Sequence, residues 1–222
     1  MDLITAMHQR HAVRSYTDKP IADEIKAELM AEAEQCNRES GLNIALVTDE
    51  PVLFSSKIVR YGRFSGVTDY ILIKGKKTAG FSEKCGYYGQ RLALKAQQLG
   101  LNSCWVAMAA YMKLPSAVKI EKDEKLMIVI SIGYGITQGT QHKSKTPQQV
   151  SNVSAASPQW FSDGVSAALL APTALNQQKF RFELVGDKVK ATSGAGFYTK
   201  LDLGIAKYQF EIGAGKDNSI WA

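Results

Sequence analysis

Cysteine and histidine are scarce in this sequence of 222 residues, with three of each. The cysteines, Cys36, Cys85 and Cys104, are scattered and odd in number, so they predict a reducing compartment and no disulfide framework. No Cys-x-x-Cys pair accompanies the histidines, and we therefore expect no metal site.

A long apolar run is also missing. No segment approaches the roughly 18 consecutive apolar residues that a membrane helix needs. The first 16 residues hold no apolar stretch followed by a small-residue cleavage site, so we expect no secretory signal. The expectation that follows is a cytoplasmic protein without a membrane partner.

The sequence lacks the short motifs of several enzyme classes. It has neither the Gly-x-Ser-x-Gly of a nucleophile elbow nor the Gly-x-x-x-x-Gly-Lys-Ser/Thr of a phosphate-binding loop. The sequence Gly133-Tyr134-Gly135 follows a good strand pattern, but the next residues neither complete Gly-x-Gly-x-x-Gly nor begin a helix. A strand-end turn is therefore a better interpretation than a dinucleotide site.

Basic residues outnumber acidic ones, and the formal net charge is +6. Lys and Arg are spread along the chain in short clusters, at 74–77 and 143–145, without a long basic tract. A small phosphorylated ligand accounts for this charge as well as nucleic acid does. A nucleic-acid-binding protein would be colourless and would bind DNA in a salt-sensitive way.

Apolar periodicity predicts an α+β fold with a mixed central sheet flanked by helices. The strongest helix pattern begins at Glu83, and Gly100 follows it as a stop. Residues 126–132 are a continuous apolar run, typical of a strand buried on both faces. Further helices are expected at 2–9 and from Asp23 onward, each capped by its Asp, with strands at 44–47 and 67–73 and a short apolar segment at 104–108.

The pattern restarts after a polar segment at 136–158, which is typical of a linker or a surface excursion. A helix (159–170), a bend (171–179) and a strand (180–185) then repeat the order of residues 24–47. With one gap, the stretch IALVTDE can be laid over FELVGDK, and GYYGQRLALKA over GIAKYQFEIGA with four identical or similar apolar positions. We infer an internal pseudo-duplication, with a larger half at 1–147 and a smaller degenerate half at 148–222 in one compact unit.

Arg10 and Arg14 lie four residues apart around the end of the first expected helix. They are consistent with a solvated helix terminus whose cations offset the helix dipole. They are also consistent with two guanidinium groups that grip an anion. Spacing alone does not choose between the two interpretations.

Four segments together resemble the flavin-dependent nitroreductase family, over most of the chain. An N-terminal arginine signature is matched by Arg10, His11, Ala12, Arg14 and Tyr16. A helix, Gly-Leu and strand element resembles GQRLALKAQQLGLNSCWVAM, and a buried strand that ends in Gly-x-Gly before a basic segment resembles residues 126–150. The fourth element, Ala/Ser-Pro-Ser-x-x-Asn-x-Gln-Pro-Trp, is matched by Ala171, Pro172, Thr173, Asn176 and Gln178.

The resemblance implies a nitroreductase-like fold that binds FMN. Arg10 with Lys143 and Lys145 would bind the phosphate, and Arg14 would stabilise negative charge on the reduced ring. At 105–108 the family has Pro-x-Glu-Gly, but Ala and Met replace Glu and Gly here, so a backbone N–H at Ala107 would face flavin N5. The cofactor-binding positions expected in this way are Arg10, His11, Ala12, Arg14, Val106, Ala107, Lys143, Lys145, Pro172, Thr173, Ala174, Asn176 and Gln178.

Single members of this set also have plain structural interpretations. Lys143 and Lys145 taken singly are consistent with a surface loop, and Asn176 with a local cap. As part of the family motif, Asn176 and Gln178 would meet the ribityl hydroxyls and the pyrimidine edge, because an amide both donates and accepts hydrogen bonds.

The fourth element lies unusually late. In ordinary members of the family it comes early and serves the flavin of the partner subunit, whereas the early position here holds EQCNRESGLN (34–43) and the good copy lies at 171–178. This resembles a branch in which one chain is a fused pseudo-dimer. The resemblance implies a monomer with one flavin and no nucleic-acid partner.

The activity that the resemblance implies is oxidoreduction. NADH or NADPH would give hydride to flavin N5, and a small-molecule acceptor, nitroaromatic or quinone-like, would receive it. The flavin carries the chemistry, so no catalytic side chain is expected, while Phe64 and Tyr111 are candidates to line the substrate pocket. The alternative is an FMN-binding protein without reductase turnover, a flavin store or regulatory module, because the early motif and the Glu-Gly pair are missing.

Overall fold

The computed structural model describes residues 1–55, 62–107, 114–116 and 118–222, and these form two compact units. The first unit holds Met1 with residues 9–81 and 92–141, and the second holds residues 2–8, 82–91 and 142–222. The predicted division at residue 147 stays a prediction. Tyr111 and Met108, both named in the sequence analysis, lie outside the described residues.

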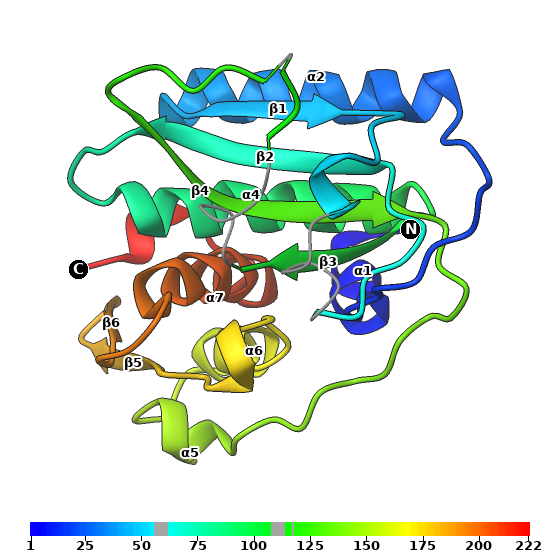
Figure 1. Cartoon of the computed structure of the whole chain (residues 1–222). Coiled ribbons are helices and arrows are strands. Elements are labelled where there is room, and N and C mark those ends of the chain that lie inside the picture. The colour runs from blue at the N-terminus through cyan, green and yellow to red at the C-terminus, as the bar shows by residue number, and fades with distance from the viewer. Residues whose placement is uncertain (56–61, 108–113, 117) are drawn as a thin grey trace. The chain divides into compact units, whose positions relative to one another are not determined.

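A four-stranded sheet in the order β1-β2-β4-β3 forms the centre of the first unit (Figure 1). Its strands are β1 (Asn43–Val47), β2 (Asp69–Lys76), β3 (Asn102–Val106) and β4 (Glu124–Gly133), and each neighbouring pair is antiparallel. A parallel element is present at the β3 edge, where Ala12 forms an isolated bridge with Ser103. Central strand β4 is buried from Leu126 to Gly133, as the apolar run predicts.

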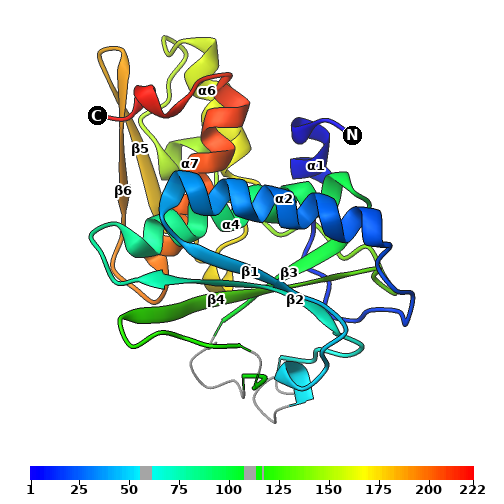
Figure 2. The ribbon, with the colours of Figure 1, turned by 90° about the horizontal axis from the view of Figure 1, so that it is seen from above.

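Helix α2 (Asp23–Ser40) covers one face of this sheet, and Figure 2 shows it on the same side as the C-terminal part of α4 (Phe81–Gln98), which belongs to the same unit. Leu29, Ala33 and Cys36 form its buried stripe, because residues three and four apart share a helix face. Asn37 connects α2 to β1, since its amide donates to Ile44 O at 2.9 Å and accepts from Ile44 N at 2.7 Å.

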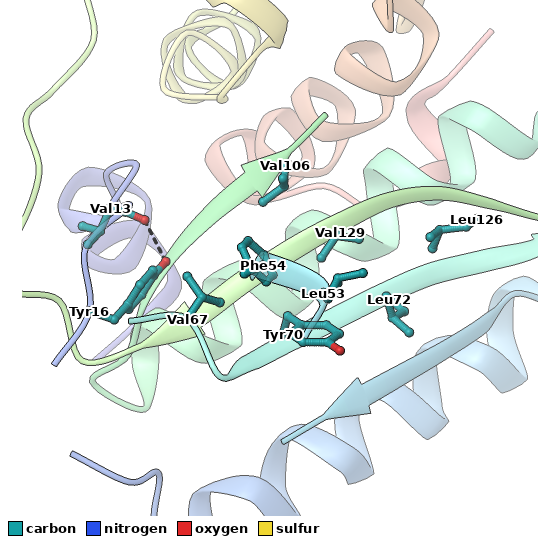
Figure 3. Close-up of a cluster of buried hydrophobic side chains, with 10 residues drawn as sticks. All are labelled: Val13, Tyr16, Leu53, Phe54, Val67, Tyr70, Leu72, Val106, Leu126 and Val129. Carbon is teal, nitrogen blue, oxygen red and sulfur yellow. Dashed lines mark hydrogen bonds between the residues drawn. The ribbon is translucent and has the colours of Figure 1, made fainter. Parts of the chain in front are cut away.

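The other face of the sheet carries a second apolar cluster (Figure 3). Phe54, in the short helix η1 (Leu53–Ser55), packs against Tyr70 of β2 and against Phe64, with ring centroids 5.6 and 5.5 Å apart. The hydroxyl of Tyr70 donates to Glu50 Oε2 at 2.6 Å. The buried members of the cluster are Val13, Tyr16, Leu53, Phe54, Val67, Tyr70, Leu72, Val106, Leu126 and Val129.

The second unit is built on α6 (Gln159–Ala168) and α7 (Thr199–Ala214), which pack side by side (Figure 1). Phe210 lies at the centre of its core, with its ring centroid 5.8 Å from that of Phe161 and 4.8 Å from that of Phe182. The antiparallel hairpin of β5 (Phe180–Val185) and β6 (Lys188–Ser193) lies beside them. The shorter helices are α1 (Leu3–Gln9), α5 (Pro147–Val150), η3 (Ala174–Asn176) and η4 (Asn218–Ile220).

Within the second unit, the N-terminal half of α4 crosses α7 at two glycines. A Cβ added at Gly86 would overlap Leu201 O and lie 3.0 Å from Ile205 N, and one at Gly204 would overlap Glu83 O and lie 2.8 Å from Tyr87 N. Leu201 and Ile205 lie 118 positions after Glu83 and Tyr87, just as Gly204 lies 118 positions after Gly86. Each glycine therefore contacts the equivalent positions of the other helix. The sequence alignment of Gly86 with Gly204 has the same offset.

Several sequence expectations differ from the structure in detail. Ala22, not Asp23, is the N-cap of α2, so Asp23 lies in the first helical turn. Asp2 does cap α1, because its Oδ1 accepts from Thr5 N at 2.8 Å. The polar segment 136–158 contains α5, and β6 was not expected. None of the helices in the described part of the chain is long and apolar enough to span a membrane.

Candidate functional site

Residues 10–16 lie along the free edge of β3 in the first unit. Val13 N donates to Ser103 O at 3.2 Å, next to the parallel bridge of Ala12 with Ser103. Farther along, Thr17 N donates to Tyr134 O at 2.8 Å and Ile136 N donates to Ser15 O at 2.9 Å. Backbone pairing on two sides therefore fixes the predicted arginine segment to the sheet.

Tyr16 anchors this segment. Its hydroxyl donates to Val13 O at 2.7 Å and lies 2.9 Å from Ser131 Oγ, and burial raises the pKa of the phenol. Two glycines make room for it, because a Cβ at Gly133 would lie 2.9 Å from the tyrosine ring and one at Gly66 would overlap Tyr16 O. The Gly-x-Gly turn after β4 thus permits close approach of the N-terminal segment.

Arg10 is the most unusual side chain of the segment. It is 4% exposed, and its Nε and Nη1 atoms are buried without a hydrogen-bond partner among the described residues. Burial lowers the pKa of this guanidinium, and the ionisable groups that act on it are Cys104 and Tyr16. Because burial raises the pKa of both of those groups, neither carries a charge at neutral pH. A buried cation without a counter-charge is costly, and an anion would complete the site.

Arg14 lies on the exposed side of the same segment. Its guanidinium is 6.0 Å from the ring centroid of Phe64, a cation–π distance, and its carbonyl accepts from Ser65 N at 3.0 Å. The structure therefore brings together a predicted ring-edge cation and a predicted substrate-pocket residue. Of the neighbouring candidates, His11 is half-buried, Ala12 is exposed, Val106 is buried at the end of β3, and Ala107 is exposed just after it.

In the second unit the predicted basic segment pairs with the predicted amide motif. Lys145 N donates to Gln178 Oε1 and Lys145 Nζ to Gln178 O, both at 2.9 Å. Asn176 Nδ2 and Gln178 Nε2 donate to Lys143 O at 2.8 and 2.9 Å, and Gln178 Nε2 also donates to Asn176 Oδ1 at 2.8 Å. Residues 33 to 35 positions apart are thus in direct contact, with Gln178 2% exposed.

These bonds show what the two amide side chains do within the chain itself. Both amide groups of Asn176 and Gln178 are engaged with protein partners, so they hold the loop 172–178 against residues 143–145. Thr173 helps to close the loop, because its Oγ1 accepts from Gln178 N at 3.1 Å. Pro172 and Ala174 are half-buried in the same loop.

The backbone of this loop is strained. Leu175, Asn176 and Gln178 have φ angles of 53°, 53° and 46°, a left-handed conformation that asparagine tolerates but that costs residues such as Leu175 and Gln178 about 1–2 kcal/mol. Leu175 is 95% exposed, so no burial of its side chain compensates. Such strain, maintained by surrounding contacts, is characteristic of functional loops.

Replacing Leu175 with glycine should therefore stabilise the ligand-free protein. Relief of the left-handed strain exceeds the added chain entropy, and we expect a gain of about 0.5–1 kcal/mol in the free energy of unfolding. Chemical denaturation measures it. The control is Val185→Gly, an exposed apolar residue of β5 without a positive φ, which should lose about 1 kcal/mol. Equal losses of unfolding free energy in Leu175→Gly and Val185→Gly would show that the backbone of Leu175 is not strained.

Two residues of this region were not among the sequence candidates. Asp202 of α7 accepts from Ala174 N at 3.0 Å and from Gln177 Nε2 at 2.8 Å. The Gln177 amide also donates to Phe197 O at 2.8 Å. Gln177 lies inside the fourth family element, but at a position where the family pattern specifies no residue. Nothing in the sequence connects Asp202 with residues 25 to 28 positions earlier.

Comparison with solved structures defines the fold class as nitroreductase-like. A structure from Thermotoga maritima described as a "putative nitroreductase" has a TM-score of 0.69 and 19% identity, covering 96% of this chain and 83% of its own. One from Desulfovibrio desulfuricans, a "putative nitroreductase in complex with FMN", has a TM-score of 0.56 and 16% identity, over 68% and 95%. A "Putative NADH dehydrogenase/NAD(P)H nitroreductase" from Parabacteroides distasonis has a TM-score of 0.52 and 20% identity, over 68% and 97%.

The family follows from the sequence. The family model described as "Putative TM nitroreductase" matches residues 2–214, and the chain belongs to this nitroreductase family. No curated protein matches it. The predicted α+β, nitroreductase-like fold is therefore confirmed.

Proposed function

We propose that the protein is an FMN-dependent oxidoreductase. NADH or NADPH would be the electron donor, and a nitroaromatic or quinone-like molecule the acceptor, in the cytoplasm. FMN supplies the hydride chemistry when bound, while the chain binds it, orients it and tunes its charge. Family membership supports the reaction class, and the individual site residues are proposals.

The buried guanidinium of Arg10, whose Nε and Nη1 have no partner among the described residues, is the observation that carries this proposal. Two of its buried donor nitrogens have no partner among the described residues, and the phosphate of FMN is a dianion with three acceptor oxygens. The residues present therefore fit the group. An uncharged ligand would leave this buried cation uncompensated.

The other residues have roles that follow from their surroundings. Arg14, exposed beside Phe64, would stabilise negative charge on the reduced ring and so raise its potential. Phe64 would offer an apolar surface to an aromatic acceptor. The exposed Lys143 would be a further cation for the phosphate, whereas the ammonium of Lys145 donates to Gln178 O and supports the loop 172–178.

The alternative within the same fold is an FMN-binding protein without turnover. The substitution of Ala107 and Met108 for the Glu-Gly pair favours this alternative. The experiment that separates the two is steady-state oxidation of NADH and of NADPH by flavin-loaded protein, with a quinone and a nitrofuran as acceptors. Turnover no faster than that of free FMN would contradict the reductase.

Flavin binding itself is tested first, by the colour of the purified protein and by the rise in thermal stability on adding FMN. We expect a yellow protein, or a colourless one whose Tm rises with FMN concentration, because a ligand of the native state stabilises it. Salt-sensitive DNA binding by a colourless protein that FMN does not stabilise would favour a nucleic-acid-binding function instead.

We also propose that one chain is a fused pseudo-dimer that binds one flavin. The support is the reciprocal contact of Gly86 and Gly204, since matching surfaces that contact each other are the mark of a two-fold interface. The element order helix-strand-strand-helix also recurs, as α2-β1-β2-α4 and α6-β5-β6-α7. Size-exclusion chromatography with light scattering should give the 24.3 kDa monomer with one FMN; an obligate dimer would contradict it.

A further inference from the structure

Asp202 joins two loops of the second unit. Its carboxylate accepts from Ala174 N in the loop 172–178, and through Gln177 Nε2 it is connected to Phe197 O in the loop 194–198. The side chain is 1% exposed, in the first turn of α7. A buried carboxylate is retained at low cost only where such donors surround it.

Both loops need an external constraint, because each contains non-glycine residues with positive φ. Leu175, Asn176 and Gln178 lie in the first loop, and Tyr198, with a φ of 59°, lies in the second. On the opposite side, Asn176 and Gln178 are bonded to Lys143 and Lys145. Asp202 therefore constrains the side of the loop 172–178 that residues 143–145 do not reach.

We propose that Asp202 is a positioning residue whose carboxylate holds the loop 172–178 in the strained conformation that contacts the flavin. This rests on the flavin site proposed above. The loop presents Leu175 outward at 95% exposure while its polar side chains are turned toward protein partners. An apolar residue on a backbone that is already ordered offers a contact surface to a planar ligand, and binding then has to order only the side chain and not the loop.

The charge state of Asp202 matters to this role. Burial raises its pKa to about 6, while the bonds from Ala174 and Gln177 lower it. Because those bonds favour the ionised form, protonation weakens them, and the loop is held most firmly above pH 6. The nearby cations do not replace them, since Lys179 Nζ donates to Ala195 O at 3.1 Å and Lys200 is exposed.

The folded-state pKa also fixes the sign of the effect on global stability. It lies above the ordinary value of 3.8, so the stabilising contribution of the protonated group is present below pH 3.8 and lost as the pH rises through about 6. As the pH rises through 6, the hydrogen bonds of Asp202 to the loop therefore become stronger, while the contribution of Asp202 to the free energy of unfolding decreases. This opposition separates a positioning role from a merely structural one.

Asp202→Asn is the test. The asparagine keeps the acceptor for Ala174 N, but its NH₂ would oppose the NH₂ of Gln177, and Gln177 cannot flip without losing Phe197 O. The matched control is Asp163→Asn on α6, an exposed aspartate that also accepts from a glutamine, Gln159 Nε2 at 2.8 Å. Hydrogen exchange of peptides that cover 172–178 and the Kd of FMN are measured from pH 5 to 8.

We expect Asp202→Asn to speed exchange in 172–178 and to raise the Kd of FMN about tenfold at pH 7.5, with no change for Asp163→Asn. In the wild type, affinity should fall as the pH drops through 6, and Asp202→Asn should abolish this dependence. Because the phosphate of FMN also titrates near pH 6, riboflavin is measured in parallel, and its affinity should follow the same profile.

The outcomes are distinguishable. Wild-type protein that binds neither FMN nor riboflavin contradicts the proposed function, and the positioning role falls with it. Wild-type protein that binds flavin while Asp202→Asn binds it with the same Kd and the same riboflavin profile contradicts the positioning role alone. A changed Tm in Asp202→Asn without a changed Kd has the same meaning, since it indicates a structural role only.

Discussion

Replacing Arg10 with methionine should stabilise the flavin-free protein and severely weaken FMN binding. Methionine keeps much of the side-chain volume and removes a buried cation whose Nε and Nη1 have no partner in the described part of the chain. We expect about 1–3 kcal/mol more stability without ligand, which is the desolvation cost of unsatisfied buried polar groups. The Kd of FMN should rise 100-fold or more, because a charge-assisted bidentate contact to phosphate is lost.

Chemical denaturation without FMN and fluorescence titration with FMN measure the two effects. The control is Arg14→Met, because Arg14 is exposed and its stability effect should stay within about 0.5 kcal/mol. Riboflavin provides a second control, since it lacks the phosphate and should bind Arg10→Met and wild type alike. If Arg10→Met destabilises the protein without FMN, the guanidinium has a structural partner and is not an anion-binding group.

The second large effect is expected at the helix crossing. Gly86→Ala and Gly204→Ala should each destabilise the protein by about 3–5 kcal/mol, since the new Cβ overlaps backbone of the facing helix, which cannot move as a side chain can. The two variants should lose similar amounts of unfolding free energy, because the two glycines contact equivalent positions of the facing helix.

Helix propensity acts in the opposite direction and must be calibrated. Alanine favours an exposed helix interior over glycine by about 1 kcal/mol, and Ala27→Gly on the exposed side of α2 measures this difference in the same protein. Urea denaturation of all three variants gives the comparison. A Gly86→Ala protein as stable as wild type would show that the two helices do not cross at this distance.

Periodicity predicted most elements of the fold because its signal is local. The apolar run at 126–132 identified β4, and the apolar stripe from Tyr88 to Leu99 identified α4. The hairpin strand β6 was missed, since its apolar and polar residues alternate weakly and only Val189 is buried. The N-cap of α2 was predicted one residue too late, because Ala22 and not Asp23 occupies that position.

The flavin contacts of the candidate site stay a prediction. The structure shows that positions 143, 145, 176 and 178, which the resemblance named from separate segments, are bonded to one another. The contacts of Asp202 could not be anticipated, because an aspartate in a helix is ordinary in sequence and its partners come from a turn of the chain 25 to 28 residues away. The lack of a partner for Nε and Nη1 of Arg10 within the described residues likewise depends on burial, which no spacing of residues encodes.

The crossing of α4 and α7 joins two segments of one chain, so a mutation there occurs once, whereas in a homodimer it would occur on both sides of the axis. The surroundings of the two glycines differ. Tyr87 donates to Glu211 and Lys207 pairs with Glu83, while the positions 118 residues from Tyr87 and Glu211 hold Ile205 and Ala93. One gene can therefore specialise the two sides of this contact separately, and natural selection acts on each side alone.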